Sequence, residues 1–349
     1  MFKVERDGRE SHWKEQQTGL RQGCPLSPYL FLIVMTVMFH DIHEGDAQRL
    51  KQHRVEGTSF DEILYADDTI CLSTDTKAMN KLLASIETES AKYGMQLNKT
   101  KCELVTNAAN PNIHFANGNR VPQLEEVKYL GCHLNNKTSI QKEIKQRLSV
   151  CMTTLRRLDL FWRQSDCPKR FKLLAHDAVI RSKLLYGLET AQINTAELAK
   201  LNAFQLKGLR KILRLTTTYI DRSNSNETVY AQANEALRLE ERHKPIKQFS
   251  EVYETRKLQL IQHILALPNN NPLRETSFQG SAAYPLNYGS RRQGRPKNRW
   301  ANEGLKQYWQ QTRHALPAAM QRHELDLNIP LHNDLVMNAA RLRLYVPHQ

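Results

Sequence analysis

The sequence predicts an α+β protein, with short strands and helices up to about residue 136 and mainly helices after it. Short apolar runs between turn-forming residues dominate the first part, which is typical of strands. In the second part, apolar residues recur every three or four positions, the spacing of one face of a helix. The 349 residues are enough for two or three domains.

A hairpin, a loop and a helix are expected first. The pair Asp7–Gly8 favours a tight turn between two short extended pieces. Residues 18–28, TGLRQGCPLSP, hold two glycines and two prolines and therefore predict a loop. Ser27–Pro28 suits the start of a helix, and the apolar run after it predicts a buried helix that ends near His40.

The next element is a hairpin with an acidic tip, within TSFDEILYADDTICLS at residues 58–73. The apolar runs Ile63–Ala66 and Ile70–Leu72 predict two strands, and Asp67 and Asp68 lie between them. Neighbouring side chains on a regular strand point to opposite faces, so a tight turn is required before both carboxylates can approach one ion.

Carboxylates at such a tip are hard oxygen ligands that suit Mg²⁺. Two Mg²⁺ ions about 3.5–4 Å apart can activate an attacking hydroxyl and stabilise a leaving pyrophosphate oxygen. An Asp-Asp pair is also typical of an ordinary hairpin turn, so the pair alone does not decide between a metal site and a turn.

An amphipathic helix follows, which Ser73 or Thr74 can cap at its start and Gly94 can end. Further strands around Leu104–Val105 and Val127–Leu130 would complete a small antiparallel sheet. The apolar face of the helix consists of Met79, Leu82, Leu83, Ile86 and Tyr93.

Beyond residue 136 the pattern is helical. One long helix is expected over residues 140–162, Pro168 suits the start of the next one, and helical patterns continue to Leu215. The polar segment Thr216–Thr228 is typical of an exposed loop or linker, and helices resume over residues 229–267.

Charge indicates a polyanionic partner. Basic residues exceed acidic ones by 14 in the whole chain, and residues 137–215 alone hold 17 Lys and Arg against six Asp and Glu. A basic face of this density suits nucleic acid, although a solvated helix surface has the same composition.

No membrane span is expected, because the longest apolar stretch, Tyr29–Phe39, is shorter than the roughly 20 residues that a span needs. The six cysteines show no CxxC spacing. Such cysteines are typical of reduced thiols in an intracellular protein, of the nucleus or the cytoplasm.

Four motifs, in this order, resemble the reverse transcriptases of non-LTR (LINE-type) retrotransposons. They are GLRQGCPLSP at 19–28 for the B motif, YADD at 65–68 for the C motif, LNKTK at 97–101 for the D motif and KYLG at 128–131 for the primer grip. The resemblance implies an enzyme that copies an RNA template into DNA, from a DNA primer and deoxynucleotide triphosphates, with two Mg²⁺ ions.

The same resemblance implies a division into three parts. These are a partial polymerase palm at 1–136, a basic helical thumb at 137–215 and a helical C-terminal region at 216–349. The thumb contains LLYG and LRKILR, and the C-terminal region contains the basic segment RRQGRPKNRW at 291–300.

Residue roles are also implied by the resemblance. Asp67 would bind metal with Asp68 beside it, and Lys101 would donate a proton to the departing pyrophosphate or stabilise it. The other implied residues are Gln22, Gly23 and Tyr65 at the nucleotide and template, Tyr129, Leu130 and Gly131 in the primer grip, and Arg156, Arg157, Lys169, Arg170 and Lys172 on the nucleic-acid backbone.

One feature of the family is missing from the sequence. The family needs a further aspartate, in its A motif, some dozens of residues before the glycine loop, and only 17 residues precede Thr18 here. Asp7 lies in the expected hairpin turn and does not fill that role. We therefore expect the fingers, the upstream palm and the endonuclease to lie outside this chain, and the chain alone to be inactive.

Three other interpretations stay open. The basic helices favour a nucleic-acid-binding remnant without catalysis, and a translated pseudogene is compatible with the same sequence. A different metal-dependent enzyme, such as a nuclease, would use Asp67 and Asp68 but leaves the glycine loop and the primer-grip match unexplained.

Overall fold

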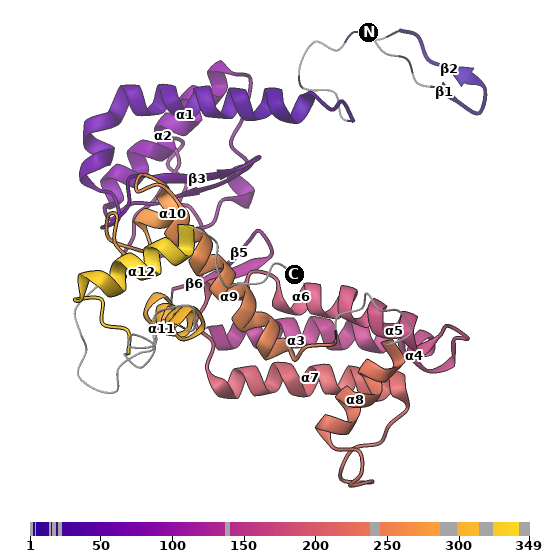
Figure 1. The fold of residues 1–349 in the computed structure, drawn as a ribbon. Coiled ribbons are helices and arrows are strands. Elements are labelled where there is room, and N and C mark those ends of the chain that lie inside the picture. Colours follow the sequence, from indigo (N-terminus) through magenta and orange to yellow (C-terminus); the bar gives the residue numbers. More distant parts are fainter. Residues whose placement is uncertain are drawn as a thin grey trace. The chain divides into compact units, whose positions relative to one another are not determined.

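The chain consists of two compact units, which are described here from a computed structural model (Figure 1). Unit 1 comprises Met1–Val127 and unit 2 comprises Lys128–Gln349. Helices predominate beside small antiparallel hairpins, which confirms the predicted α+β class. The residues that the structure describes are 3, 5–13, 15, 19, 23–136, 140–237, 245–286, 299–313 and 324–341.

Unit 1 consists of short hairpins and two long helices. Its elements are β1 (Glu5–Arg6), β2 (Arg9–Glu10), α1 (Ser27–Gln52), β3 (Glu62–Tyr65), β4 (Asp68–Cys71), α2 (Thr76–Lys92) and the 3₁₀ turn η1 (Lys99–Lys101). The turn at Asp7–Gly8 is confirmed, because it joins β1 to β2. The prediction of a single sheet is wrong. In the described residues, β1–β2, β3–β4 and β5–β6 form three separate two-stranded sheets.

Helix α1 differs from its prediction in length and in burial. It does not end near His40 but continues to Gln52, and Ile42, beyond the predicted end, is buried in the core shared with α2. Only one of its faces is buried, where it packs on α2. Its other face exposes Leu30, Leu32, Ile33 and Val37.

The N-cap of helix α2 lies one residue beyond the last of the two predicted caps, Ser73 and Thr74. The residue is Asp75, whose carboxylate accepts a hydrogen bond of 2.8 Å from the Ala78 N–H. Gly94 follows the end of the helix in a left-handed conformation, as predicted. Between Met35, Met38, Phe39 and Ile42 of α1 and Leu82 and Ile86 of α2 lies the core of unit 1.

The described part of unit 2 is mainly helical and begins within a hairpin, whose first strand starts at the last two residues of unit 1. Its elements are β5 (Glu126–Tyr129), β6 (Cys132–Asn135), α3 (Ile140–Arg157), α4 (Asp159–Gln164), α5 (Lys169–His176), the π turn η2 (Asp177–Arg181), α6 (Ser182–Leu185), the 3₁₀ turn η3 (Leu188–Thr190), α7 (Thr195–Leu213), α8 (Asn226–Leu237), α9 (Phe249–Ala266), α10 (Pro272–Glu275), α11 (Trp300–Thr312) and α12 (Pro330–Arg341). None of the described helices is long and apolar enough to cross a membrane.

The predicted long helix over residues 140–162 is broken at Leu158. The break separates α3 from α4 and follows from the packing of Trp162, which is 1% exposed. The indole N–H of Trp162 donates to the Leu155 carbonyl at 3.1 Å, an acceptor that a continuous helix would give to the backbone N–H of Asp159.

Helix α9 joins the two predicted regions of unit 2. Phe249, Val252 and Tyr253 at its start pack among α3, α6 and α7, and Ile261 and Leu265 further along pack with α11 and α12. Residues 137–215 and 216–349 therefore share one compact unit. The division into palm, thumb and C-terminal region stays a prediction.

Helix α7 lies against α5 where Gly208 faces His176. An alanine methyl group at Gly208 would overlap the imidazole, which is 2% exposed. Burial lowers the pKa of His176 from 6.5 to about 4, so the folded protein holds the ring neutral. This contact fixes the position of α7, which is part of the site described below.

Acid is expected to destabilise unit 2 through His176. Because its pKa is lower in the folded state, the stabilisation is complete above pH 6.5 and is lost as the pH falls towards about 4. The loss is at most about 3 kcal/mol. Denaturant unfolding followed by tryptophan fluorescence at several pH values measures it. His176→Gln, which does not titrate there, should show less pH dependence; equal dependence in both proteins would contradict the assignment.

Gly208→Ala is expected to lower the free energy of unfolding by about 2–3 kcal/mol, because the methyl group displaces a buried ring. Gly45→Ala is the matched control: Gly45 lies in α1 and an added methyl group meets nothing within 4 Å. That change should stabilise the protein by about 0.5–1 kcal/mol through helix propensity. Equal stabilities of the two variants in denaturant unfolding would show that α5 and α7 are not closely packed.

Candidate functional site

The acidic hairpin has the predicted form. Strands β3 and β4 are antiparallel, Tyr65 pairs with Asp68, and the two-residue turn is Ala66–Asp67. Ala66 has φ +54°, the left-handed conformation that the first central residue of a type II′ turn adopts. An alanine there is strained, a feature that clusters at functional sites. Both carboxylates are exposed, and Tyr65 is 62% exposed.

The base of this hairpin is held in place while its tip is open to solvent. His43 of α1 lies 2.9 Å from Glu62, and the Arg54 guanidinium donates to both oxygens of the buried Asp61 at 2.9–3.1 Å. Burial, and then the nearby Glu62 carboxylate, raise the pKa of the Cys71 thiol to about 12. The tip therefore projects from a rigid support.

Sequence reasoning missed this support. Its residues come from α1, from the segment after α1 and from β3, and their side chains meet only in the folded chain. The ligand atoms of His43, Asp61 and Glu62 lie within 4.8 Å of one another. Because Arg54 already neutralises Asp61, this group ties the hairpin to α1 and is not our candidate for a metal site.

The tip offers the type of ligand that a divalent cation prefers, but it offers too few of them. Asp67 and Asp68 offer the hard carboxylate oxygens that such an ion prefers. Among the described residues, no third His, Cys, Asp or Glu joins them to form a cluster of three. The arrangement agrees with a metal site that needs a further carboxylate.

Other predicted residues of unit 1 lie on separate segments. Gly23 has φ +85°, a conformation that favours glycine, and Gln22 lies outside the described residues. Lys101 is exposed on η1, and in the described part of the chain no ion pair joins it to the hairpin tip. Its neighbour Cys102 is close enough to Cys71 to affect its pKa, which puts this segment near the base of β4.

The second hairpin brings the predicted primer-grip residues together. Tyr129 ends β5, and Leu130 and Gly131 form the turn, with φ +46° and +81°. Positive φ at both central residues is the hallmark of a type I′ turn. A Cβ at Gly131 would lie 3.5 Å from the ring of Tyr186, so the turn rests on this half-exposed aromatic side chain.

A buried ion pair holds this hairpin against α3. Arg147 pairs with Glu143 one turn away and also donates to the backbone carbonyl of Tyr186 and, at 3.3 Å, to the Cys132 sulfur. The other Glu143 oxygen accepts from the His133 N–H at 3.3 Å. The pair therefore links both strand β6 and the residue beneath the turn to one helix.

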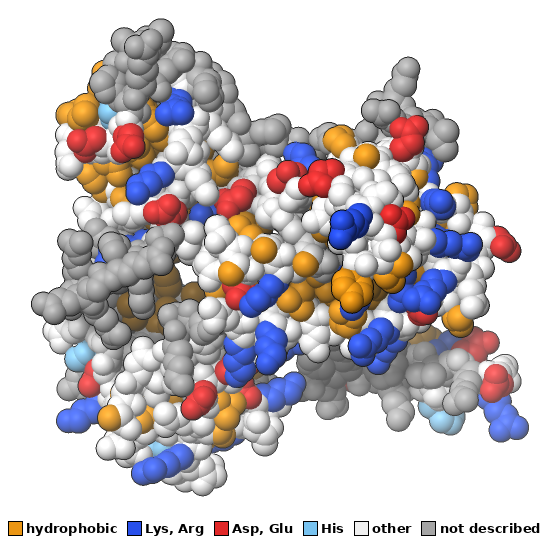
Figure 2. Space-filling view, turned by 90° about the horizontal axis from the view of Figure 1, so that it is seen from below, with side chains coloured by type: hydrophobic (Ala, Val, Ile, Leu, Met, Phe, Trp, Pro, Cys, Tyr) orange, Lys and Arg blue, Asp and Glu red, His pale blue; other side chains and the backbone are white. Residues whose placement is uncertain are grey.

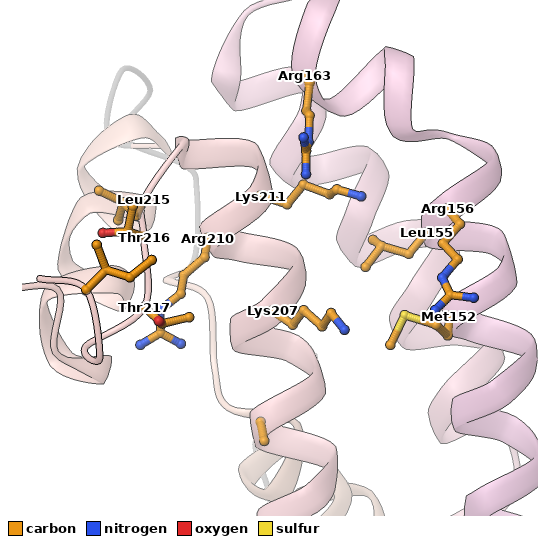
Figure 3. A pocket seen from close by; sticks show the side chains of 12 residues that line it. Met152, Leu155, Arg156, Arg163, Lys207, Arg210, Lys211, Leu215, Thr216 and Thr217 are labelled. Atoms are coloured by element: carbon orange, nitrogen blue, oxygen red, sulfur yellow. The ribbon is translucent and has the colours of Figure 1, made fainter.

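A basic groove runs between α3–α4 and α7 (Figure 3). Its basic residues are Arg156, Arg163, Lys207, Arg210 and Lys211; its remaining residues are apolar or carry hydroxyl groups, and include Met152, Leu155, Leu215 and Thr216. A second hollow continues it along the same helices, past Leu148 and Lys200. Figure 2 shows Lys and Arg side chains grouped beside exposed hydrophobic ones on one face of the molecule.

The groove confirms none of the predicted backbone contacts, but it separates the candidates. Arg156 lines it, whereas Arg157, Lys169 and Arg170 do not. Lys172 must be withdrawn: it is 4% exposed, and its ammonium group donates to the carbonyls of Trp162 and Ser165 at the end of α4. Contact with a nucleic acid would require it to leave these partners.

Four groove cations were missed, although the sequence offers a signal for them. Lys207 and Lys211 are four residues apart and so share one face of α7, and Arg210 and Lys211 lie within the motif LRKILR. Arg163 comes from α4 and offers no such signal. The remaining basic motif, RRQGRPKNRW, lies outside the described residues except for Arg299 and Trp300.

Comparison with known proteins gives a match for the first part of the chain. Residues 1–134, which include all four motifs, match the family model described as "Reverse transcriptase (RNA-dependent DNA polymerase)". A putative uncharacterized transposon-derived protein of Caenorhabditis elegans is 22% identical over 170 residues, 47% of this chain and 61% of that protein. The Pol polyprotein of the type-1 retrotransposable element R2 of Nasonia vitripennis is 27% identical over 148 residues, 39% of this chain and 14% of that protein.

The turn with two carboxylates lies within the segment that matches the reverse transcriptase family model. The similarity to reverse transcriptases covers residues 1–134, and the two relatives are by name a transposon-derived protein and a retrotransposon Pol polyprotein. The chain spans less than two thirds of the length of either curated relative.

Proposed function

We propose that this chain supplies the metal-binding hairpin, the primer grip and part of the nucleic-acid surface of an RNA-directed DNA polymerase. The observation that carries the proposal is the exposed YADD tip on a rigid base, within a segment that matches the reverse transcriptase family. Unit 1 would be part of the palm, and the basic helices of unit 2 would be the thumb.

At the tip, Asp67 would hold a divalent ion, Mg²⁺ in our proposal, with Asp68 as a weaker partner. The bound ion would polarise the phosphoryl oxygens and stabilise the leaving pyrophosphate. Tyr65 would pack near the primer end, and Gln22 and Gly23 would face the nucleotide and the template. Lys101 would stabilise the departing pyrophosphate after a movement of its exposed segment.

The partners of this proposal are an RNA template, a DNA primer and deoxynucleotide triphosphates. The turn at Tyr129–Gly131 would position the primer, supported by Tyr186 and Arg147. A third carboxylate would complete the metal site, because two ligands from one turn leave most of an octahedral shell to water and substrate. The described residues bring none to the tip.

Templated primer extension tests the proposal. The longest protein that the native transcript encodes is incubated with an RNA template, a labelled DNA primer, the four deoxynucleotides and Mg²⁺. We expect extension that requires the template and the divalent ion, and no extension by the 349-residue chain alone. If the native protein does not extend the primer, the polymerase proposal is overturned and a nucleic-acid-binding remnant is favoured.

A further inference from the structure

We propose that the groove between α3 and α7 binds single-stranded nucleic acid, with Tyr219 as the side chain on which a base stacks. The inference rests on the proposed function, because the strand that it assigns to this surface is an unpaired part of the template or primer on which the polymerase acts. It goes beyond that function in naming the form of the strand and the residue that selects it.

The groove contains cations that the protein itself does not neutralise. Asp159 pairs with both Arg163 and Lys211. Within the described part of the chain, Arg156 and Lys207 have no such carboxylate, and both line the two neighbouring hollows. Figure 3 shows the Lys207 side chain extending from α7 toward the helix that carries Arg156. Two unpaired cations from facing helices suit a phosphate group.

The groove ends at a loop that exposes an aromatic side chain. Tyr219 is 97% exposed and Ile220, which lines the groove, is 73% exposed. Figure 1 shows the loop between α7 and α8 projecting beyond α8. The faces of a tyrosine ring that is exposed to this degree are open to stacking by a base.

The loop is held in shape by hydrogen bonds that do not involve the Tyr219 side chain. The buried Asn224 donates to Thr216 at 3.0 Å, and its carbonyl accepts from Arg210 at 3.2 Å. The N–H groups of Ile220 and Asp221 both donate to the Thr217 carbonyl. Tyr219 is therefore presented by a hydrogen-bonded turn next to Ile220, which lines the groove.

This combination favours an unpaired strand over a duplex. A duplex presents phosphates to basic residues but keeps the faces of its bases stacked on one another. A single strand offers both, because its backbone can follow the cations while a base stacks on an aromatic ring. The partly exposed apolar groove residues Met152 and Leu215 suit sugars and bases better than they suit a second row of phosphates.

Binding measurements on the 349-residue chain test the inference. The probes are a fluorescent oligouridylate and an oligothymidylate of about 12 nucleotides, within the range of known single-strand sites, and a duplex of equal length. We expect tighter binding of the single strands. Tyr219→Ala should weaken it about tenfold, the size of one stacking contact, and Tyr219→Trp should restore it. Binding of the duplex should be unchanged in both variants.

Two further variants separate stacking from charge. Phe171→Ala removes a ring that is 55% exposed on α5 and does not line the groove, so it should leave binding unchanged. Arg156→Gln with Lys207→Gln should reduce the slope of log affinity against log salt by about 0.7 for each lost phosphate contact. Tyr219→Ala should leave that slope as it is.

The inference is overturned if the duplex binds as tightly as the single strands, if Tyr219→Ala binds as the unchanged chain does, or if none of the probes binds at low salt. These outcomes are independent of primer extension. A chain that binds single strands through Tyr219 but belongs to an inactive protein would contradict the proposed function alone.

Discussion

Replacement of Asp67 by Asn should reduce templated primer extension by the native protein about a thousandfold, the largest effect that we expect of any single change. The reason is that the contribution of a catalytic divalent ion amounts to several kcal/mol of transition-state stabilisation, and Asn cannot replace the charge of its carboxylate ligand. The fold should tolerate the change, because Asp67 is exposed in a turn where Asn is also favoured.

The controls lie on the same hairpin and elsewhere on the surface. Asp68→Asn should lower the rate less, since Asp68 is the weaker partner in the proposed site. Asp166→Asn, at an exposed loop position of unit 2, should leave the rate unchanged. Circular dichroism of each variant checks the fold. Full activity of Asp67→Asn would remove Asp67 from the metal site and with it the proposed role of the YADD turn.

The acidic hairpin could be predicted from the sequence because its signals are local. Two short apolar runs on either side of Asp67 and Asp68 predict the strands β3 and β4, and the structure has both. The turn at Leu130–Gly131 is not predicted: the strand expected over Val127–Leu130 ends at Tyr129, and Leu130 lies in the turn with a positive φ. At the predicted hairpin, the residues that determine the element are neighbours in the chain.

The predictions fail where distant segments meet. Lys172 belongs to a basic helix in the sequence, but in the fold it reaches the free carbonyls at the end of α4, which accept its ammonium group. The same holds for the break at Leu158, which depends on the hydrogen bond from Trp162 to Leu155. Periodicity predicts which face of a helix is apolar and does not predict what that face contacts.

The groove is a second case in which the sequence does not predict which residues meet in the fold. Arg156 could be named from the basic composition of its helix, whereas its grouping with Lys207 depends on how α3 and α7 pack. That packing is fixed by buried contacts such as the one between Gly208 and His176. Motifs predict the chemistry of the hairpin tip, and tertiary packing decides which cations lie together.

Arg147→Met should lower the free energy of unfolding of unit 2 by about 3–5 kcal/mol, because it leaves the buried Glu143 carboxylate without its cation. The change also removes the donors to the Tyr186 carbonyl and the Cys132 sulfur, which hold the β5–β6 hairpin to α3. Denaturant unfolding followed by tryptophan fluorescence measures the loss, since three of the four tryptophans lie in unit 2.

The matched control is Arg163→Met, which breaks an ion pair with the same i, i+4 spacing at the surface and should cost about 1 kcal/mol or less. Adding Glu143→Gln to Arg147→Met should restore part of the lost stability, because the unpaired buried charge is then gone. If the double variant is no more stable than Arg147→Met, the lost stability comes from the missing hydrogen bonds to the hairpin and not from the unpaired Glu143 carboxylate. A cost below about 1 kcal/mol for Arg147→Met itself would show that the pair does not hold the hairpin.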